Sequence, residues 1–447
     1  MTTAPGVHII TLGCPKNEAD SQALTRRLKA EGIRVVEDPA GASHLLVNTC
    51  GFIEDARKES IGAILEAADC YPEARLHVMG CLVERYRPEL EEGLPEVHGW
   101  YGLADLGALA ANLKAEAGSA AAGLDPSLPA SSRASIIASP SASHAYVKIS
   151  DGCDHLCSFC AIPDIKGPYY SLSLSEIMEQ VEGALEAGAR ELVFVGQDTT
   201  LWRCDGMDVL ELVGLVSEDE RVLRVRLMYL QPEHVDDRFL AMMALHPKLC
   251  RYLDIPFQHA HRDVLRAMGR RGDAATYLHL LERARIIMPD VSVRSTFIVG
   301  FPGETEEHVA ALGDFLRVAR FDHAGAFAFS PEEGTSAAAL DRRPPALTVR
   351  KRMSYVSAIL AESAERACRA RVGERLEVLI DSPADADAPE GVVAIGRTRG
   401  QAPDVDGVTY LSGRLPPDVG VGAAVQAVVT EAIGHDLVAE PDAIEPA

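Results

Sequence analysis

The chain has 447 residues, enough for about three domains, and 47% hydrophobic with 24% charged residues is the composition of a folded globular protein. It has no run of about 18 apolar residues, and its N-terminus lacks a basic segment followed by a long apolar one, so we expect neither a membrane span nor a secretory signal, and a cytoplasmic location. The formal net charge of −23 disfavours nucleic acid as the main partner and favours a basic protein.

Residues 6–115 alternate short apolar stretches with helical ones. The stretches HIITL, IRVV, HLLVN and RLHVM predict strands, and two helices are expected over 17–32 and 54–69, the first ending at Gly32. This alternation is typical of a parallel sheet with helices on its faces, a Rossmann-like domain. Residues 116–143, rich in Ala, Ser, Pro and Gly, are predicted to be a linker.

Residues 144–371 resume the alternation, with six predicted strands and a long helical segment from 346 onwards. Six strand–helix units are too few for an eight-stranded barrel, so we expect a partial (β/α)6 barrel. Residues 372–440 show only short strands separated by turn signals, which predicts a small antiparallel β-barrel. The expected fold class is therefore α/β, with a parallel-sheet domain, a partial barrel and a terminal β-barrel.

Three of the ten cysteines stand close together in SDGCDHLCSFCAIP, where Cys153, Cys157 and Cys160 form a C-x3-C-x2-C motif. Disulfides are not expected in a reducing compartment, and the motif follows a predicted barrel strand, at the end where such barrels have active sites. Three thiolates suit a four-iron cluster that keeps one iron open for a substrate or cofactor. A zinc site completed by His155 is the alternative.

A second set of cysteines is spread over the N-terminal domain. Cys14, Cys50 and Cys81 each follow the end of a predicted strand. Because the carboxyl ends of parallel strands meet at one edge of a sheet, we expect the three thiols to converge there as metal ligands. Each has a neighbouring glycine, which is expected to let the backbone approach a bulky ligand: Gly13, Gly51 and Gly80.

The cysteine loop, with an aromatic residue before its last cysteine, resembles that of the radical S-adenosylmethionine superfamily. The resemblance implies that S-adenosylmethionine binds the open iron of a [4Fe-4S] cluster and is cleaved to a 5′-deoxyadenosyl radical. It also implies cofactor contacts after the second strand, at Gly196 and Gln197, and after the fifth, from Gly300 to Glu304. For these glycines, ordinary turn geometry is an equally good interpretation.

Two cysteine sets and a terminal β-barrel make the chain similar to the methylthiotransferase family, whose small barrel is called TRAM. Several stretches look like the branch that modifies an aspartate of the twelfth small-subunit ribosomal protein: GCPKN, VGQDTT, YLDIPFQH, TFIVGFPGET and FSPEEGT. The resemblance implies β-methylthiolation of one aspartate with two [4Fe-4S] clusters, and S-adenosylmethionine as radical source and methyl donor. It further implies a basic ribosomal protein as substrate and an electron donor such as flavodoxin or ferredoxin.

Two other functions stay open at this point: a tRNA adenosine 2-methylthiotransferase, and a non-enzymatic iron–sulfur or zinc scaffold. Residues 369–447 hold six Arg against fourteen Asp and Glu, whereas an RNA-binding module should be basic, so tRNA is the less expected substrate. The chain departs from the family pattern at Lys166 and Leu172, where arginines are usual, which affects the expected anion contacts there. No catalytic residue beyond the metal ligands is assigned.

Overall fold

The computed structural model describes residues 6–117, 143–416 and 419–442. They form two compact units: an N-terminal one, which includes the short segments 152–154 and 161–169, and a second one with the remaining residues. The linker predicted over 116–143 lies almost entirely outside the described residues. Among the described helices, none is both long and apolar enough to cross a membrane.

The N-terminal unit is built on a five-stranded parallel sheet with the order β2-β1-β3-β4-β5. Its elements are β1 (Gly6–Thr11), α1 (Pro15–Ala30), β2 (Arg34–Val35), β3 (His44–Thr49), α2 (Glu54–Cys70), β4 (Arg75–Gly80), α3 (Cys81–Gly93), β5 (Val97–Tyr101) and α4 (Leu106–Ala117), with α5 (Ile162–Lys166) from the second segment. The four predicted strands and two predicted helices are present, and Gly32 takes a φ of +80° just after α1. Sequence analysis missed β5, α3 and α4.

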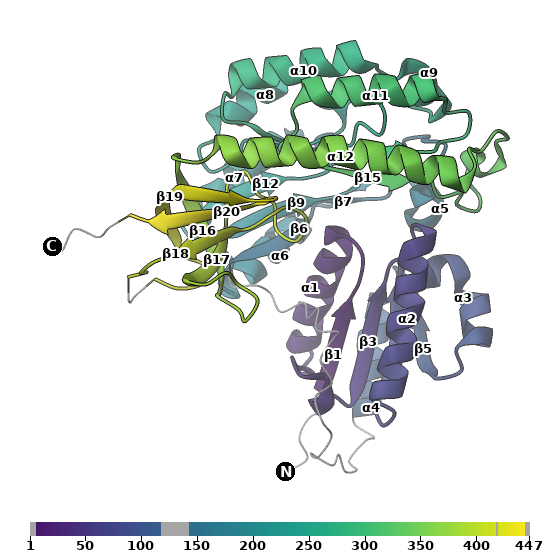
Figure 1. Cartoon of the computed structure of the whole chain (residues 1–447). Coiled ribbons are helices and arrows are strands. Elements are labelled where there is room, and N and C mark those ends of the chain that lie inside the picture. The colour runs from purple at the N-terminus through teal and green to yellow at the C-terminus, as the bar shows by residue number, and fades with distance from the viewer. Residues whose placement is uncertain (1–5, 118–142, 417–418, 443–447) are drawn as a thin grey trace. The chain divides into compact units, whose positions relative to one another are not determined.

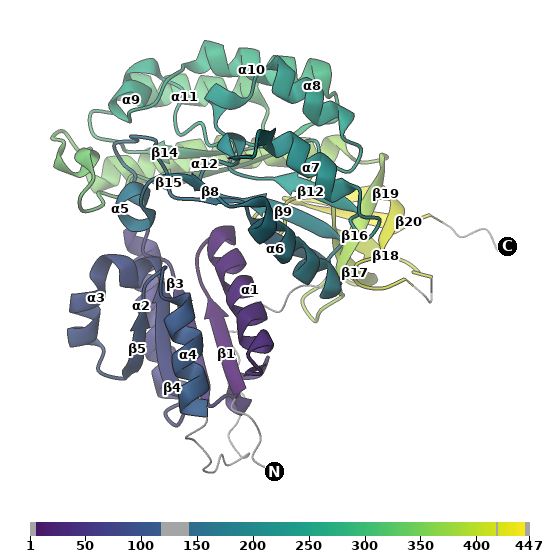
Figure 2. The same ribbon diagram turned by 180° about the vertical axis from the view of Figure 1, so that it is seen from behind.

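Both faces of this sheet are covered, because successive side chains of each buried strand point to opposite sides. Ile10 and Val47 pack with α2 and α3, whereas Val7, Ile9 and Leu46 pack with α1 and α4. Figure 1 and Figure 2 show these helix pairs on the two sides of the sheet. This is the parallel-sheet domain predicted from the sequence.

The second unit begins with six parallel strands in two three-stranded sheets, β12-β9-β6 and β13-β14-β15. The six are β6 (His144–Lys148), β9 (Glu191–Val195), β12 (Arg224–Leu227), β13 (Tyr252–Asp254), β14 (Ser292–Val299) and β15 (His323–Ala328). Leu230 N donates to Asp254 O at 2.9 Å, and Val225 forms a parallel bridge with Leu249, so the two sheets are joined edge to edge in chain order. The predicted partial barrel is confirmed.

Helices and short two-stranded sheets complete the partial barrel. They are β7 (Ser150–Asp151) with β8 (Tyr170–Ser171), β10 (Arg203–Cys204) with β11 (Met207–Asp208), α6 (Leu174–Glu186), α7 (Val209–Ser217), α8 (Asp237–Leu245), α9 (Arg262–Ala267), α10 (Ala274–Ile287), α11 (Glu306–Ala319) and α12 (Ala346–Ala370). Sequence analysis predicted six strand–helix units here, with helical stretches that match α6, α7 and α11 and a long segment from 346 that is α12, but it named no stretches for α8, α9 and α10. Figure 1 shows α12 running along the barrel to the terminal domain, where it packs on β19.

The terminal domain is a closed barrel with the order β16-β17-β18-β20-β19. Its strands are β16 (Arg375–Pro383), β17 (Val392–Thr398), β18 (Thr409–Ser412), β19 (Ala424–Ile433) and β20 (Asp436–Pro441). The pairs are antiparallel as predicted, except that β18 and β20 are parallel. The exception follows from the number of strands, because strand direction cannot alternate all the way round a closed barrel of five strands, so one neighbouring pair must be parallel.

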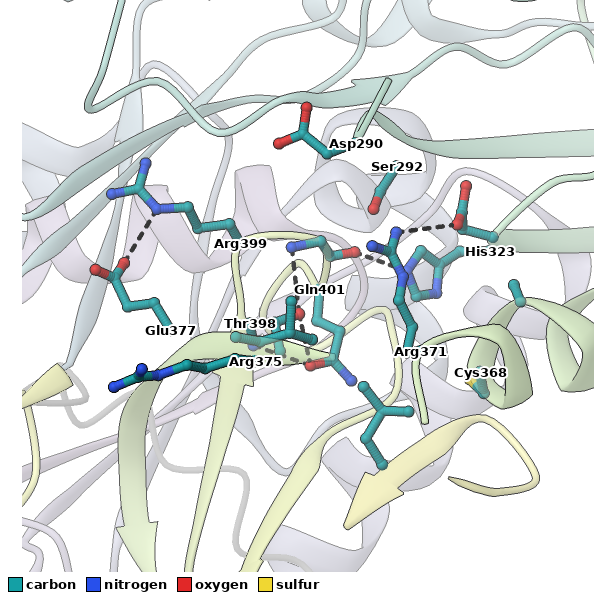
Figure 3. Close-up of a pocket in the computed structure, with 15 residues that line it drawn as sticks. Asp290, Ser292, His323, Cys368, Arg371, Arg375, Glu377, Thr398, Arg399 and Gln401 are labelled. Carbon is teal, nitrogen blue, oxygen red and sulfur yellow. Dashed lines mark hydrogen bonds and ion pairs between the residues drawn. The ribbon is translucent and has the colours of Figure 1, made fainter. Parts of the chain in front are cut away.

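The segment 397–406 of this small barrel lies against the amino ends of all six parallel strands. The contacts are Tyr146 Oη to Asp404 (2.9 Å), Glu191 to Arg397 (2.7 Å), Arg224 Nη1 to Arg397 O (3.2 Å), Tyr252 Oη to Asp406 (2.6 Å), Arg294 to Asp406 (3.4 Å) and His323 Nε2 to Gly400 O (2.7 Å). We call this set the polar joint. Figure 3 shows the pocket beside this joint, where Arg399 pairs with Glu377. Arg371, which also lines this pocket, pairs with Asp322 at 3.6 Å.

The centre of the polar joint is the fully buried carboxylate of Glu191. Arg224, Arg226 and Arg397 each place a guanidinium nitrogen within 2.9 Å of it. Burial alone would raise the pKa of Glu191, but the three guanidinium groups hold that pKa well below its usual range. The terminal barrel is therefore fixed to the partial barrel by charges that are costly to separate.

Candidate functional site

The N-terminal cysteines lie at the carboxyl ends of β1, β3 and β4, which are neighbours in the sheet. Cys14 is the N-cap residue of α1, Cys50 directly follows β3, and Cys81 is the first residue of α3. We call these three residues the strand-end set. Two of its members stand at helix N-termini, where the backbone dipole favours negatively charged sulfur.

The flanking glycines allow these strand ends to approach one another. A Cβ at Gly13, whose φ is +98°, would lie 2.6 Å from Cys50 Cβ, and a Cβ at Gly51 would lie 2.8 Å from Cys81 O. Such separations are not tolerated between real atoms, so a side chain at either position would push the cysteines apart. These glycines face the neighbouring strand end, and their expected role in letting the backbone approach a ligand stays a prediction.

Asn17 holds the strand-end set from within, a role that sequence analysis did not find. Its buried amide donates to Leu12 O at 2.8 Å and to Thr49 O at 3.2 Å, while its own carbonyl accepts from Asn48 Nδ2 at 2.9 Å. Cys50 is braced separately, because Ser60 Oγ lies 3.0 Å from both its N and its O. Asn17, three residues after Cys14, therefore fixes the backbone next to Cys14 and Cys50.

Burial is the largest influence on the pKa values of two of these thiols. It raises the pKa of Cys50 to about 11 and that of Cys81 to about 12, and the nearby Cys14 thiol acts in the same direction on both. Positive charge acts in the opposite direction: Lys16 lowers the pKa of Cys50, and Lys166 lowers that of Cys81. An anionic metal–thiolate group in this place is thus supported by lysines as well as by helix ends.

Lys166, one of the departures from the family pattern, belongs to this surrounding. Its side chain is 2% exposed, and Nζ lies 3.6 Å from Asp20 Oδ2. It is carried by α5, whose Ile165, together with Ala161, packs on Cys81. The segment after the cysteine loop therefore supplies a buried cation to the strand-end set. The other departure, Leu172, instead packs against the core of the partial barrel.

The donor set itself bears on the choice of metal. Cys14, Cys50 and Cys81 offer three thiolates at neighbouring strand ends. Three thiolates suit a four-iron cluster that keeps one iron without a protein ligand, whereas a structural zinc site takes four protein ligands. The residues present therefore fit the cluster.

The second set, Cys153, Cys157 and Cys160, is carried by the loop after β6 and β7, as predicted; we call it the loop set. The middle of the loop is clamped at Ser158, whose N and Oγ donate to Met268 O (2.9 Å) and Ala267 O (2.8 Å) at the end of α9. Ala337 N donates to Ser158 O at 2.8 Å from the other side. The loop is thus held by groups distant in sequence.

His155, the alternative zinc ligand, is engaged elsewhere. Its Nε2 lies 2.8 Å from Oδ2 of the fully buried Asp198, and this hydrogen bond raises the pKa of the imidazole. His234 Nε2 is 4.0 Å from the same oxygen. Asp198 comes from VGQDTT, a motif that sequence analysis quoted without giving this residue a role.

The predicted cofactor contacts divide into two kinds. Both amide atoms of Gln197 are buried and have no hydrogen-bond partner within the described part of the chain, so both have capacity for hydrogen bonds to a ligand or to water. A Cβ at Gly196 would overlap Ser150 Oγ, so this glycine is needed for packing. Glu304 instead accepts from Gly300 N at 3.0 Å and pairs with Arg352 at 2.9 Å.

These positions support the amide of Gln197 as a cofactor contact more strongly than the carboxylate of Glu304, whose partners are inside the protein. Gly300 has a φ of +83°, and a Cβ there would also meet Val349. Its contact with the cofactor stays a prediction, as does that of Glu304.

Comparison with known proteins agrees with this architecture. Family models match at residues 6–102 (uncharacterized protein family UPF0004), 147–316 (radical SAM superfamily) and 372–441 (TRAM domain). A solved structure of the radical S-adenosylmethionine methyltransferase TsrM from Kitasatospora setae, with cobalamin and a [4Fe-4S] cluster bound, has a similar fold. Its TM-score is 0.53 at 16% identity, covering 75% of this chain and 77% of that one.

Similar relatives extend over nearly the whole chain. A ribosomal protein uS12 methylthiotransferase RimO from Nocardioides sp. is 38% identical and covers 97% of both chains. The protein of the same name from Thermodesulfovibrio yellowstonii is 37% identical over 96% of this chain and 98% of its own. The chain therefore belongs to the RimO family of ribosomal protein uS12 methylthiotransferases.

Proposed function

We propose that this protein attaches a methylthio group to the β-carbon of an aspartate in ribosomal protein uS12, the substrate named for its relatives. The observation that carries the proposal is the presence of two separate three-cysteine sets, one on a barrel loop and one at three strand ends. A protein that only cleaved S-adenosylmethionine would need one set. The second set gives the chain a place for the sulfur chemistry.

The two clusters and S-adenosylmethionine supply, when bound, the hydrogen-abstracting radical, the sulfur and the methyl group. The protein's own residues bind and orient these groups. We assign Cys153, Cys157 and Cys160 to one cluster and the strand-end set to the other. Gln197 supplies an amide with unused hydrogen-bonding capacity for S-adenosylmethionine at the carboxyl end of β9.

A basic protein substrate suits the charge of the chain better than tRNA. The net charge is −23, and the loop between β16 and β17 exposes Asp385, Asp387 and Glu390. Such a surface attracts the basic surface of a ribosomal protein and repels phosphate. We further propose a cytoplasmic location and a small electron donor such as flavodoxin or ferredoxin.

Mass spectrometry of uS12 tests the substrate. In cells that lack this gene, uS12 should lose the mass that one methylthio group adds in place of hydrogen, and expression of the intact gene should restore it. An unchanged uS12, with loss of a methylthio group from tRNA instead, would assign the protein to the tRNA-modifying branch. An unchanged pattern in both would contradict a methylthiotransferase.

A further inference from the structure

Arg270 is a buried arginine beside the loop set, with 8% of its surface exposed. It follows the end of α9, where Gly269 takes a φ of +70° and Arg270 N donates to Leu265 O at 2.8 Å. This helix end also receives the two hydrogen bonds from Ser158. The same backbone therefore fixes both the cysteine loop and the direction of the Arg270 side chain.

The contacts of the guanidinium group are unusual for a buried arginine. Nη2 donates to Pro256 O at 3.1 Å, and Nη1 lies 3.9 Å from the Sγ of Cys157. The third nitrogen, Nε, is buried and has no hydrogen-bond partner within the described residues. Among the residues that the structure describes, the sulfur of Cys157 is thus the one potentially anionic atom that hydrogen-bonds or pairs with this side chain.

The other buried arginines give the comparison. Arg224, Arg226 and Arg397 pair with Glu191, and Arg352 pairs with Glu304. Across the described ranges, no carboxylate oxygen lies within 4.0 Å of Arg270. Because a buried cation without an anion is strongly unfavourable, this position calls for a negative charge that the protein's carboxylates do not provide.

We propose that Arg270 is the counter-cation of the loop-set cluster, and that it raises the reduction potential of this cluster through its contact with Cys157. Reduction adds one negative charge to the cluster, and a nearby cation stabilises the reduced form more than the oxidised one. A hydrogen bond to a cluster sulfur acts in the same direction. Arg270 is a positioning residue in this account, acting through the thiolate.

The proposal rests on the assignment of the loop set as a cluster site, but it does not depend on uS12. The test uses the full chain with Cys14, Cys50 and Cys81 replaced by Ala, so that one cluster gives the whole signal. After anaerobic reconstitution with iron and sulfide, the potential is measured by titration monitored with electron paramagnetic resonance. Iron content is measured on the same samples.

In this background, R270Q should lower the ratio of reduced to oxidised cluster at a fixed potential at least tenfold, about 59 mV for a one-electron couple. R270K keeps the charge without the planar fork and should shift the potential less than R270Q. R266Q is the matched control, since the Arg266 side chain lies on the same helix, is 76% exposed and pairs with Asp263; it should leave the potential unchanged.

A parental potential in R270Q, with the four irons still bound, would overturn the proposal. If R270Q retains no cluster, R270K decides: retained iron supports the role of the charge, whereas equal loss in both variants overturns it. If R270Q leaves the potential unchanged, the uS12 proposal still stands. If uS12 is found not to be modified, the role of Arg270 still stands, because the potential is measured without uS12.

Discussion

The two cysteine sets offer the same three thiols from opposite kinds of structure. The loop set comes from eight consecutive residues and is recognised by spacing, whereas the strand-end set spans residues 14–81 and exists only when the sheet has formed. The loop depends on a clamp at Ser158. The strand ends depend on Asn17 and on glycines that leave no room for a side chain. The loop set, although local in sequence, thus depends on hydrogen bonds from distant residues. The strand-end set, which is dispersed in sequence, depends on close packing of the strand ends.

The largest expected effect separates the two sets by iron content. Replacing Cys153, Cys157 and Cys160 by Ala should leave about four irons per chain instead of about eight, and so should replacing the strand-end set. Replacing both sets should leave none. Iron and acid-labile sulfide analysis measures this, and unchanged iron after loss of either set contradicts its assignment.

The partial barrel that carries the loop set is held to the terminal barrel by the polar joint at the amino ends of its strands. Glu191→Gln leaves three guanidinium groups facing a neutral amide and should lower the free energy of unfolding of the second unit by about 3–5 kcal/mol. Glu182→Gln is the control, because its pair with Arg221 is exposed and its loss should leave the free energy of unfolding almost unchanged. Denaturant unfolding followed by circular dichroism compares the two variants.

The effect of Glu191 should depend on pH with a definite sign. Because its folded-state pKa is lowered, its contribution is complete above the pKa of an unfolded glutamate, about 4.3, and is lost as the pH falls below that value. The stability difference between wild type and Glu191→Gln should therefore shrink as the pH is lowered from 5 towards 3. A difference that grows with acid would contradict the ionic account.

The support of the strand-end set can be broken at Gly13. Gly13→Ala combines a φ of +98° with a Cβ only 2.6 Å from Cys50 Cβ, and should cost about 1–3 kcal/mol and selectively release the strand-end iron. Gly32→Ala is matched, since its φ is +80° but nothing lies within 4 Å of the added Cβ. Equal iron loss in both variants would mean that backbone strain alone, and not the approach of the strands, explains the effect.

The smallest expected effect is at Lys166. Lys166→Met removes the buried cation beside Asp20 and Cys81, and should weaken iron retention in the strand-end set during dialysis against a chelator. Lys166→Arg keeps the charge and should retain more iron than Lys166→Met. If the Lys166→Met and Lys166→Arg variants retain iron equally, the charge at residue 166 does not affect iron retention.

Prediction from the sequence succeeded where a signal was local or repeated. The six barrel strands, the turn at Gly32 and the placement of Cys14, Cys50 and Cys81 after strands all follow from short apolar runs and their neighbours. The helix α9 was missed, because its six residues are too few to show a helical period.

Contacts between residues distant in sequence could not be predicted. Glu191 meets Arg397 across 206 positions, and Arg270 meets Cys157 across 113, with no pattern in the sequence that links either pair. The resemblance to the superfamily implied Glu304 as a cofactor contact, which stays a prediction, but no pattern indicated that its oxygens accept from Gly300 N and Arg352. The position of a residue after a strand predicts where in the fold it lies. Its hydrogen-bond and ion-pair partners depend on which distant residues the fold places beside it.

The central claim is that the loop set generates the radical and the strand-end set supports the sulfur transfer. The most direct measurement incubates reconstituted enzyme with S-adenosylmethionine, reductant and uS12, and quantifies 5′-deoxyadenosine and methylthiolated uS12 together. Wild type should form both products, and the variant with Cys14, Cys50 and Cys81 replaced by Ala should form only 5′-deoxyadenosine. Methylthiolated uS12 from that variant would contradict the account.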